Sequence, residues 1–510
     1  MRLFPMCCTM LLVLACSEGP TSTAPATPTP VTPPVNPPTG SATFVVPFTV
    51  GAAGSDYGKH LTTDAAGNVF AAGFFNGTVD FDPGPAQVMR TASGISDAYL
   101  AKYDATGRFL WVSTMGGPGA EMPYHVSVDA SGNLYLAGYV SAGTTCGGSS
   151  PLPNGGRRDA FVAKFTAAGA CQWAVTAGGA LDDEARGFAV DADGTVYFAG
   201  MFQTTADFDP GVGTALLESR GAEDIFLAKY TSAGALTWAR AFGGTAADEG
   251  MALATDNSGN VYLGGFFSAS VDFDPGSGIR TLTSAGDGDI VLAKYDASGS
   301  LRWADAMGGA QLDHINIGEL IVDQQSGVTV SGQMRGIVDL DPGAAMQPFT
   351  SAGNSDVFVA RYAQTDGRYL SAFRFGGTGM DGSHSLRLDN TGNVYLAGWI
   401  TGRVDMDPGA GERVLTGTTS GGGTDIYVAK YSPSGTPFWA SAVLSNASGT
   451  TAFGMATGVA IGANGTLWMT GRFYGTADFS GGVGAAMATS AGESDAFIAQ
   501  FDSAGGLIKR

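Results

Sequence analysis

The residues best suited to chemistry are four histidines: His60, His125, His314 and His384. Lys59, Tyr124, Arg186 and Glu319 stand near them or at matching points of a sequence repeat. Imidazole, phenol, guanidinium and carboxyl groups together suit a ligand pocket, a metal site or proton transfer. The alternative is that this point of the repeat is merely exposed to solvent. No two of the histidines have the short spacing of a zinc signature, and no catalytic residue is assigned. The predicted ligand-binding residues are His60, Tyr124, His125, Arg186, His314, Glu319 and His384.

A second candidate site is the motif Asp-x-Asp-Pro-Gly, which is found five times. Carboxylates beside Gly-rich turns can bind Ca²⁺, which takes six to eight oxygen ligands. The alternative is that the aspartates cap a turn by accepting backbone N–H bonds. Each motif has only two carboxylates and lacks the spacing of an EF-hand loop. The candidate calcium ligands are Asp80, Asp82, Asp207, Asp209, Asp272, Asp274, Asp339, Asp341, Asp405 and Asp407.

These residues lie on a unit that repeats from residue 41 onward. In one copy, residues 251–256, 261–267, 289–295 and 301–309 read as four strands, here named a to d. Gly-containing turns join a to b and c to d, as tight hairpins require. The Asp that opens strand c and the Gly late in strand b both occur seven times. They are Asp97, Asp159, Asp224, Asp289, Asp356, Asp425 and Asp495, and Gly73, Gly138, Gly200, Gly265, Gly332, Gly398 and Gly471.

Four-stranded units at a fixed period favour a β-propeller over a sandwich. We therefore predict an all-β, seven-bladed β-propeller with blades of about 65 residues. The last copy stops where its strand d begins, and residues 44–51 before the first copy match strand d. The N-terminal strand is thus expected to pair in the last blade and close the ring, which leaves no open sheet edge.

The repeated pattern Val-Tyr-Leu-Ala-Gly, Asp-x-Asp-Pro-Gly, Asp-Ala-Phe-Val-Ala-Lys and Leu-x-Trp resembles the bacterial seven-bladed β-propeller repeat family. The resemblance covers residues 41–510. It implies the propeller fold and a secreted or surface protein. It implies no activity.

The composition fits this fold and excludes other classes. Gly, with 78 of 510 residues, is about twice its average use, and charged residues are about half as frequent as usual. Many tight turns explain the glycine, and packing on both blade faces explains the lack of charge. The formal net charge of −20 argues against nucleic-acid binding.

The N-terminal residues have the features of an export signal. Residues 1–15 read as a lipoprotein signal peptide, and Val13-Leu14-Ala15-Cys16 resembles a lipobox whose Cys16 is lipidated. A cleaved signal without lipid is the alternative. Residues 16–40 are the anchored Cys and a Pro/Thr-rich tether, and residues 41–510 are the propeller. Localisation at the bacterial outer membrane or cell surface follows, with the lipid as the only membrane contact.

The strand order places the acidic motifs and the d–a connections on one face of the propeller, so this face should carry the acid excess. It also places Cys146 and Cys171 on opposite faces, about 20 Å apart along strand c. A disulfide needs Cα atoms within about 7 Å, which predicts two free thiols unless the loop before strand c folds back. The basic residue late in strand c, such as Lys294, should pair with the Asp ending strand a, such as Asp256. The strand-d tryptophans should pack between blades.

Two functions remain open. The first is a monomeric, non-catalytic binding or scaffold protein that takes a cell-surface protein or glycan on its acidic loop face. The second is a polysaccharide lyase or hydrolase with acid/base residues at the channel mouth. No nucleophile elbow, zinc-protease motif or phosphate loop is found, which favours binding. Calcium is the one cofactor considered.

Overall fold

A computed structural model describes residues 47–148, 150–323, 327–418, 423–445, 453–462, 465–482 and 484–509. The predicted signal peptide, Cys16 and the tether lie outside the described residues. The described residues form β-strands and no α-helix, which confirms the all-β prediction. None of the described segments forms a helix that could cross a membrane.

The four strands of each repeat form an antiparallel sheet in the order a, b, c, d. Strands a are β2 (Tyr57–Thr63), β8 (Met122–Val128), β13 (Glu184–Val190), β17 (Glu249–Thr255), β23 (His314–Val322), β29 (Gly382–Leu388) and β35 (Phe453–Ile461). Strands b are β3 (Val69–Phe75), β9 (Leu134–Ser141), β14 (Val196–Asp207), β18 (Val261–Phe267), β24 (Gly327–Met334), β30 (Val394–Ile400) and β36 (Leu467–Tyr474).

Strands c are β6 (Asp97–Tyr103), β11 (Arg158–Phe165), β15 (Leu216–Tyr230), β21 (Asp289–Tyr295), β27 (Asp356–Ala363), β33 (Asp425–Tyr431) and β39 (Asp495–Phe501). Strands d are β7 (Phe109–Gly116), β12 (Cys171–Gly179), β16 (Leu236–Phe242), β22 (Leu301–Gly309), β28 (Tyr369–Gly377) and β34 (Pro437–Ser445). Beside β39 the outer strand is β1 (Phe48–Val50), with Phe48 opposite Ile498 and Val50 opposite Ala496.

Strands b and c are buried on both faces. In β21 every residue except Lys294 is buried, and β18 is nearly the same. Such continuous apolar strands are typical of sheets that are covered on both sides. The core is accordingly divided into clusters that join neighbouring sheets; one unites Leu227 and Trp238 with Leu263 and Tyr295.

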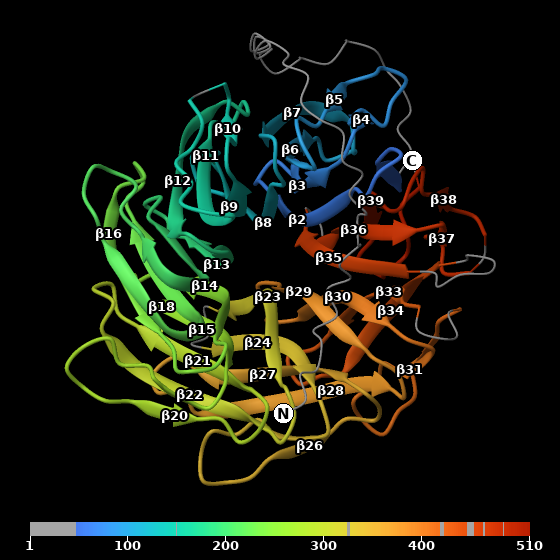
Figure 1. Ribbon diagram of the computed structural model, residues 1–510. Helices are drawn as coiled ribbons and strands as arrows, with labels where there is room; N and C mark the ends of the chain where they lie inside the picture. Colours follow the sequence, from blue (N-terminus) through green and yellow to red (C-terminus); the bar gives the residue numbers. More distant parts are fainter. Residues whose placement is uncertain are drawn as a thin grey trace, which may run out of the picture. The chain divides into compact units, whose positions relative to one another are not determined.

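The strands a, called the inner strands below, contact one another in chain order. β2 contacts β8, and the series continues through β13, β17, β23 and β29 to β35, which in turn contacts β2. In Figure 1 the labels of β2, β8, β13, β23, β29 and β35 surround the middle of the view. The inner strands therefore bring together side chains that lie hundreds of residues apart in the sequence.

Short hairpins occur in the b–c connections. They are β4 (Thr78–Asp80) with β5 (Met89–Thr91), β19 (Ser270–Asp272) with β20 (Thr281–Thr283), β25 (Ile337–Asp339) with β26 (Pro348–Thr350), β31 (Arg403–Asp405) with β32 (Val414–Thr416), and β37 (Thr476–Asp478) with β38 (Met487–Thr489). β25, β31 and β37 each pair with strand d of the preceding sheet. The strands d β22, β28 and β34 thus gain a partner and are no longer open sheet edges.

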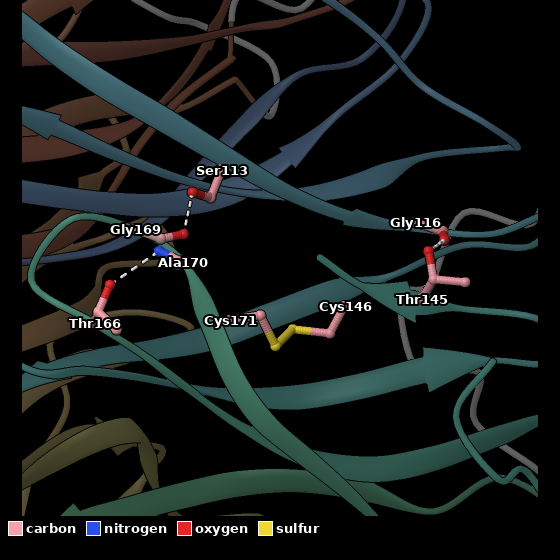
Figure 2. Close-up of a disulfide and its surroundings, with 8 residues drawn as sticks. All are labelled: Ser113, Gly116, Thr145, Cys146, Thr166, Gly169, Ala170 and Cys171. Atoms are coloured by element: carbon pink, nitrogen blue, oxygen red, sulfur yellow. Dashed lines mark hydrogen bonds between the residues drawn. A yellow bond between two sulfur atoms is a disulfide. The ribbon is translucent and has the colours of Figure 1, made fainter. Parts of the chain in front are cut away.

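The prediction of two free thiols is wrong, because Cys146 and Cys171 form a disulfide with Cα atoms 6.0 Å apart (Figure 2). Cys146 ends the short strand β10 (Thr145–Cys146), which folds back and pairs with β7 of the preceding sheet. Cys171 begins β12 of its own sheet. The predicted separation of about 20 Å assumed that the b–c connection stays at one end of its own sheet. Part of this connection instead pairs with the preceding sheet. The disulfide consequently links two neighbouring sheets.

Two further predictions agree with the structure. The strand-c cations Lys102, Lys294, Arg361 and Lys430 form ion pairs with the Asp ending strand a, for example Lys294 with Asp256 at 3.6 Å. The indole N–H of Trp238 donates to the carbonyl of Ala297 in the next repeat at 3.2 Å, and Trp173, Trp303 and Trp439 make equivalent bonds. The tryptophans therefore pack between sheets, as predicted.

Candidate functional site

Each inner strand carries a β-bulge at the same place. One residue of strand a stands opposite no residue of strand b, and these residues are Lys59, Tyr124, Arg186, Met251, His384 and Thr457. In β23 the irregularity is longer: residues 316–319 lie between Ile315 and Leu320, whose partners are Gly332 and Val330. A bulge re-aims a side chain away from the ordinary alternation of a strand. We call the six single residues and residues 316–319 the bulge ring.

The bulge also explains the strand-b glycine that marks every repeat. A Cβ on Gly265 would lie 2.1 Å from the carbonyl oxygen of Glu249, the first residue of its strand a. The other six strand-b glycines face the equivalent carbonyl oxygen at 1.7–2.1 Å. No side chain fits in that space, so the glycine is required wherever strand a is bulged.

Members of the bulge ring contact one another across neighbouring strands. The ammonium of Lys59 lies 4.0 Å from the ring centre of Tyr57 and 5.3 Å from that of Tyr124. Arg186 reaches the sulfur of Met251 at 3.9 Å. The hydroxyl of Thr457 donates to the carbonyl of Gly58, the residue before Lys59. Some neighbouring bulges thus contact each other.

His60 and His125, two of the predicted ligand-binding residues, lie together. Their ring centres are 5.3 Å apart. Nε2 of His125 is 2.6 Å from the carbonyl of Arg186, and a guanidinium nitrogen of Arg387 is 2.6 Å from Nε2 of His60. Burial, followed by the charge of Arg387, lowers the pKa of His60 well below its ordinary value. Burial lowers the pKa of His125 to about 4.

Tyr124 and Arg186, also predicted, belong to a charge-neutralised network. The Tyr124 hydroxyl donates to Glu184 at 3.0 Å, and the Arg186 guanidinium lies 3.0 Å from the same carboxylate. Arg186 also pairs with Glu249. Burial raises the pKa of Glu184, but Arg186, the Tyr124 hydroxyl and Arg158 together outweigh burial, and the pKa falls. Two carboxylates of the protein therefore neutralise the charge of Arg186.

His314 and His384 lie in a second group with different surroundings. The ring of His384 is 4.7 Å from that of Trp399. Burial and then the charge of Lys59 lower the pKa of His384 to about 3, and His314 and Arg472 add to the effect. Burial and Arg335 lower the pKa of His314 to about 4. These effects put Lys59, His314, His384 and Arg472 near one another.

Residues 316–319 lie within β23 and approach His125 on β8. Gly318 has a φ of +76° and lies against His125: a Cβ on it would be 2.6 Å from Cε1 of the imidazole. Glu319 is fully buried and accepts a bond from the Ser383 hydroxyl at 2.9 Å, while its Oε1 has no hydrogen-bond partner. Burial raises the pKa of Glu319 to about 8, so its carboxyl is protonated at neutral pH.

All seven predicted ligand-binding residues thus lie on inner strands, in or beside the bulge ring. The four histidines are weak bases at neutral pH. A general acid or base works best with a pKa near the operating pH, and the histidine pKa values lie far below neutrality. Among the described residues no group of three or more His, Cys, Asp or Glu side chains is placed to hold a metal ion.

The acid excess does not form the exposed face that the strand order predicted. The carboxyl groups of the d–a connections, such as Asp183, Asp248 and Asp313, are at most 1% exposed. Asp183 accepts N–H bonds from Gly179 and Gln203 at 2.7 and 3.0 Å, which ties strand d to strand b. The Asp opening each strand c is likewise buried. Sequence position alone could not separate an exposed carboxylate from one that caps buried backbone.

The Asp-x-Asp-Pro-Gly aspartates also accept backbone bonds. Oδ1 of Asp272 accepts from the N–H groups of Asp274 and Arg280 at 3.1 and 2.7 Å, and Oδ1 of Asp274 accepts from Gly276 at 2.8 Å. The other four motifs repeat this pattern. The turn-capping role is therefore present in all five motifs, and calcium binding by them stays a prediction.

Sequence reasoning missed several residues of this site. Arg387 on β29, Arg472 on β36 and Trp399 on β30 all lie close to the predicted histidines. Glu184 and Glu249 belong to the d–a connections, for which the sequence predicted only a place on an acidic face. The available clue was the strand-b glycine, because a glycine repeated at one buried strand position signals a close backbone approach.

No protein-family model matches the chain. The regulatory protein FlaEY of Caulobacter vibrioides is 26% identical over 433 residues, which cover 79% of this chain and 42% of that protein. An uncharacterized WD repeat-containing protein, L264, of Acanthamoeba polyphaga mimivirus is 21% identical over 439 residues, 70% of this chain and 31% of that protein. The chain spans less than half the length of these curated relatives.

Two solved structures share a distant likeness. Quinohemoprotein alcohol dehydrogenase ADHIIG from Pseudomonas putida has a TM-score of 0.36 and 11% identity, covering 90% of this chain and 77% of that one. A Bacteroides caccae protein of unknown function has a TM-score of 0.34 and 9% identity, covering 67% and 89%. Similarities at these TM-scores say nothing of ligand or activity. The repeated four-stranded antiparallel sheets are those of a β-propeller repeat protein.

Proposed function

We propose that residues 41–510 form a closed, seven-bladed β-propeller that acts as a non-catalytic binding protein. Closure is supported by the pairing of β1 with β39 and by the contact of β35 with β2. The inner strands would then line a central channel. The joints between blades are reinforced by the b–c hairpins that pair with the preceding strand d. A rigid support of this kind suits a site that must be in place before its ligand arrives.

The observation that carries the binding function is the bulge ring. Its backbone distortion recurs in every inner strand, whereas its side chains differ: Lys, Tyr, Arg, Met, His and Thr. A purely structural feature would repeat its side chain, as the strand-b glycine does. Different side chains on a repeated backbone suit recognition of an asymmetric ligand. The ligand class we propose is a cell-surface glycan or the surface of a partner protein.

The enzyme alternative has less support. A lyase or hydrolase needs an acid and a base that reach the substrate with suitable pKa values. The imidazoles at the site are weak bases, and Glu319, whose pKa burial raises to about 8, is fully buried. A binding role needs neither group to exchange protons.

We further propose that the protein is exported and anchored by lipid on Cys16, with the Pro/Thr-rich segment as a tether. It would act as a monomer at the outer membrane or cell surface. Labelling cells with a palmitate analogue tests this: label should enter the wild-type chain but not Cys16→Ser. Equal labelling of both would contradict the anchor.

The binding role is tested by screening the full chain against arrays of glycans and of bacterial surface proteins. Any ligand that binds should bind at least tenfold more weakly to Lys59→Gln and to His384→Gln. The control is Arg368→Gln, since Arg368 is exposed in a c–d turn and its ion pair within the described residues is with Asp366 at 4.0 Å. A ligand that binds all four proteins equally would place the site elsewhere and contradict this proposal.

A further inference from the structure

One joint between neighbouring sheets lacks the aromatic pair that fills five others. In those five repeats the strand-d Trp packs against an aromatic residue of strand b, with ring centres 6.1–6.4 Å apart. The pairs are Phe70 with Trp111, Tyr135 with Trp173, Tyr197 with Trp238, Tyr262 with Trp303, and Tyr395 with Trp439. In the fifth repeat Thr329 and Ser371 stand at these two positions. This repeat therefore lacks two ring systems.

The pairing of the strands supports the equivalence of these positions. In the fourth repeat the row across strands b, c and d consists of Tyr262, Lys294 and Trp303. In the fifth repeat the same row consists of Thr329, Arg361 and Ser371. Because the two rows match position by position, the small side chains of the fifth repeat lie where the fourth repeat has rings.

A cavity of about 230 Å³ lies at this place. It is lined from one sheet by Thr329, Ser371 and Phe373 and from the next by Leu388, Val394 and Pro433. One hydrophobic cluster joins the two sheets around it. Phe373, Leu388 and Val394 give the cavity an apolar wall, and Thr329 and Ser371 add hydroxyl groups. Pro433 belongs to a c–d turn, so the cavity lies at the opposite end of the strands from the bulge ring.

The cavity also contains the equivalent of a carbonyl group that accepts an indole N–H in other joints. Trp238 donates to the carbonyl of Ala297, which is the second residue after Tyr295 at the end of strand c. In the joint after the fifth repeat the equivalent residue is Pro433, the second residue after Tyr431. A ring bound in the place of the missing indole would therefore have an acceptor for an N–H group.

The strand-c cation beside the cavity pairs within its own sheet. In the third repeat Lys229 donates to the carbonyl of Ala297 at 3.1 Å, the same carbonyl that accepts the indole N–H. Arg361 instead directs its Nε and a terminal nitrogen to Asp323, at 3.1 and 2.6 Å. Neither of these two nitrogens is directed to Pro433, whose carbonyl can accept a bond from a ligand.

Phe373 replaces only part of the missing tryptophan. In the third repeat the Trp covers a glycine of the next c–d turn, since a Cβ on Gly299 would lie 3.2 Å from Cε2 of Trp238. In the fifth repeat Phe373 covers Gly435, whose Cβ would lie 2.7 Å from its Cγ. The Phe373 ring also packs on that of Tyr431, with centres 5.2 Å apart. The turn thus has a cover of its own, and the cavity remains beside it.

We propose that this cavity binds a small planar aromatic molecule that carries an N–H group, such as an indole. The bound ring takes the place of the strand-d Trp and donates to the carbonyl of Pro433. The cavity is smaller than the roughly 300–1,000 Å³ of pockets for drug-sized ligands, which limits the ligand to about one bicyclic ring. Apolar cavities of about 150 Å³ can bind a single aromatic ring. This site is separate from the bulge ring and does not depend on the proposed function.

Titration calorimetry of the full chain with indole tests the proposal. We expect one site per chain with a dissociation constant of about 1 mM or lower. Benzofuran has the shape of indole but an oxygen in place of the N–H. It should therefore bind about three- to tenfold more weakly, the usual effect of losing one hydrogen bond. Equal affinity for the two compounds would overturn the assignment of an N–H donor.

Variants that fill or open the cavity make the test specific. Ser371→Trp restores the missing indole and should abolish binding, and Thr329→Tyr restores the other ring and should weaken binding. The control Val212→Trp adds a tryptophan to an exposed b–c connection and should bind indole as the wild type does. Trp303→Ser should open a comparable cavity in the neighbouring joint and add a second binding site.

The melting temperature shows whether a filled variant is folded. Unchanged indole binding by a Ser371→Trp protein that melts no lower than the wild type would overturn the site. So would the absence of indole binding to the wild type at millimolar concentration. A tryptophan-containing peptide that binds where free indole does not would show that the cavity takes a side chain of a partner, and would also overturn the proposal.

Discussion

Replacing one buried aspartate should stabilise the protein, and more so at high pH. Asp313 is fully buried; its Oδ1 accepts the Arg335 N–H at 2.9 Å, and its Oδ2 has no partner. Burial, with the charge of Asp289 adding to it, raises the pKa of Asp313 from 3.8 to about 7. The side chain in Asp313→Asn keeps the Oδ1 acceptor and has no proton to lose.

The sign and size of the effect follow from linkage. The folded pKa lies above the unfolded one, so the stabilising effect of protonation is complete below about pH 4 and is lost as pH rises through about 7. A rise of about 3 pK units costs the folded wild type about 4 kcal/mol at high pH. About 2–3 kcal/mol of this arises between pH 5 and pH 8. Asp313→Asn should therefore gain roughly that much stability over the wild type between the two pH values.

Urea unfolding at pH 5 and pH 8, followed by tryptophan fluorescence, measures the difference. The matched control is Asp389→Asn. Burial raises the pKa of Asp389, but hydrogen bonds from Thr391 and Asn393 outweigh burial and lower this pKa to about 2. Its loss of stability should be equal at the two pH values, because both lie above its folded and unfolded pKa. If the wild type and Asp313→Asn show the same difference in stability at both pH values, the buried-carboxyl reasoning is wrong.

Three other predictions concern the fold. Gly265→Ala should lower the free energy of unfolding in urea by about 1–3 kcal/mol, since its Cβ would overlap the Glu249 carbonyl. The control Gly409→Ala should change this free energy by less than about 0.5 kcal/mol. Equal effects of the two substitutions would contradict the bulge as the cause. Reductant should lower the free energy of unfolding of the full chain by about 3 kcal/mol through loss of the Cys146–Cys171 bond. It should not change the stability of a variant in which both of these cysteines are replaced by Ser. A wild type whose stability does not respond to reductant would contradict the disulfide. Chelator should leave the melting temperature unchanged, because the Asp-x-Asp-Pro-Gly aspartates already cap turns; a fall of several degrees would support the calcium sites instead.

The repeats made most of the fold predictable. The strand-b Gly and the Asp that opens strand c recur seven times, the strand-c cation six times and the strand-d Trp five times, so an error in one copy is corrected by the others. The partner of the last strand c also followed from sequence, since β1 does pair with β39. The Cys146–Cys171 pairing did not follow, because it depends on a b–c loop unlike those of the other repeats, and no repeat pattern describes that path.

The candidate site was predictable only in part. The histidines, Tyr124, Arg186 and Glu319 stood out as unusual residues at one point of the repeat, and the structure places them on the inner strands. Arg387 and Arg472 did not stand out, because a single basic residue on a strand has no sequence context that marks it. The burial of the acidic residues was hidden for a related reason: the N–H groups that they cap belong to other strands.

The central claim is that ligands bind at the bulge ring, and a crystal structure of the full chain with a ligand found on the arrays tests it most directly. The ligand should be present at a concentration near its dissociation constant, so that weak adventitious sites stay empty. The account predicts that the ligand contacts Lys59 and His384. A ligand bound only at the tips of the b–c hairpins would contradict the account.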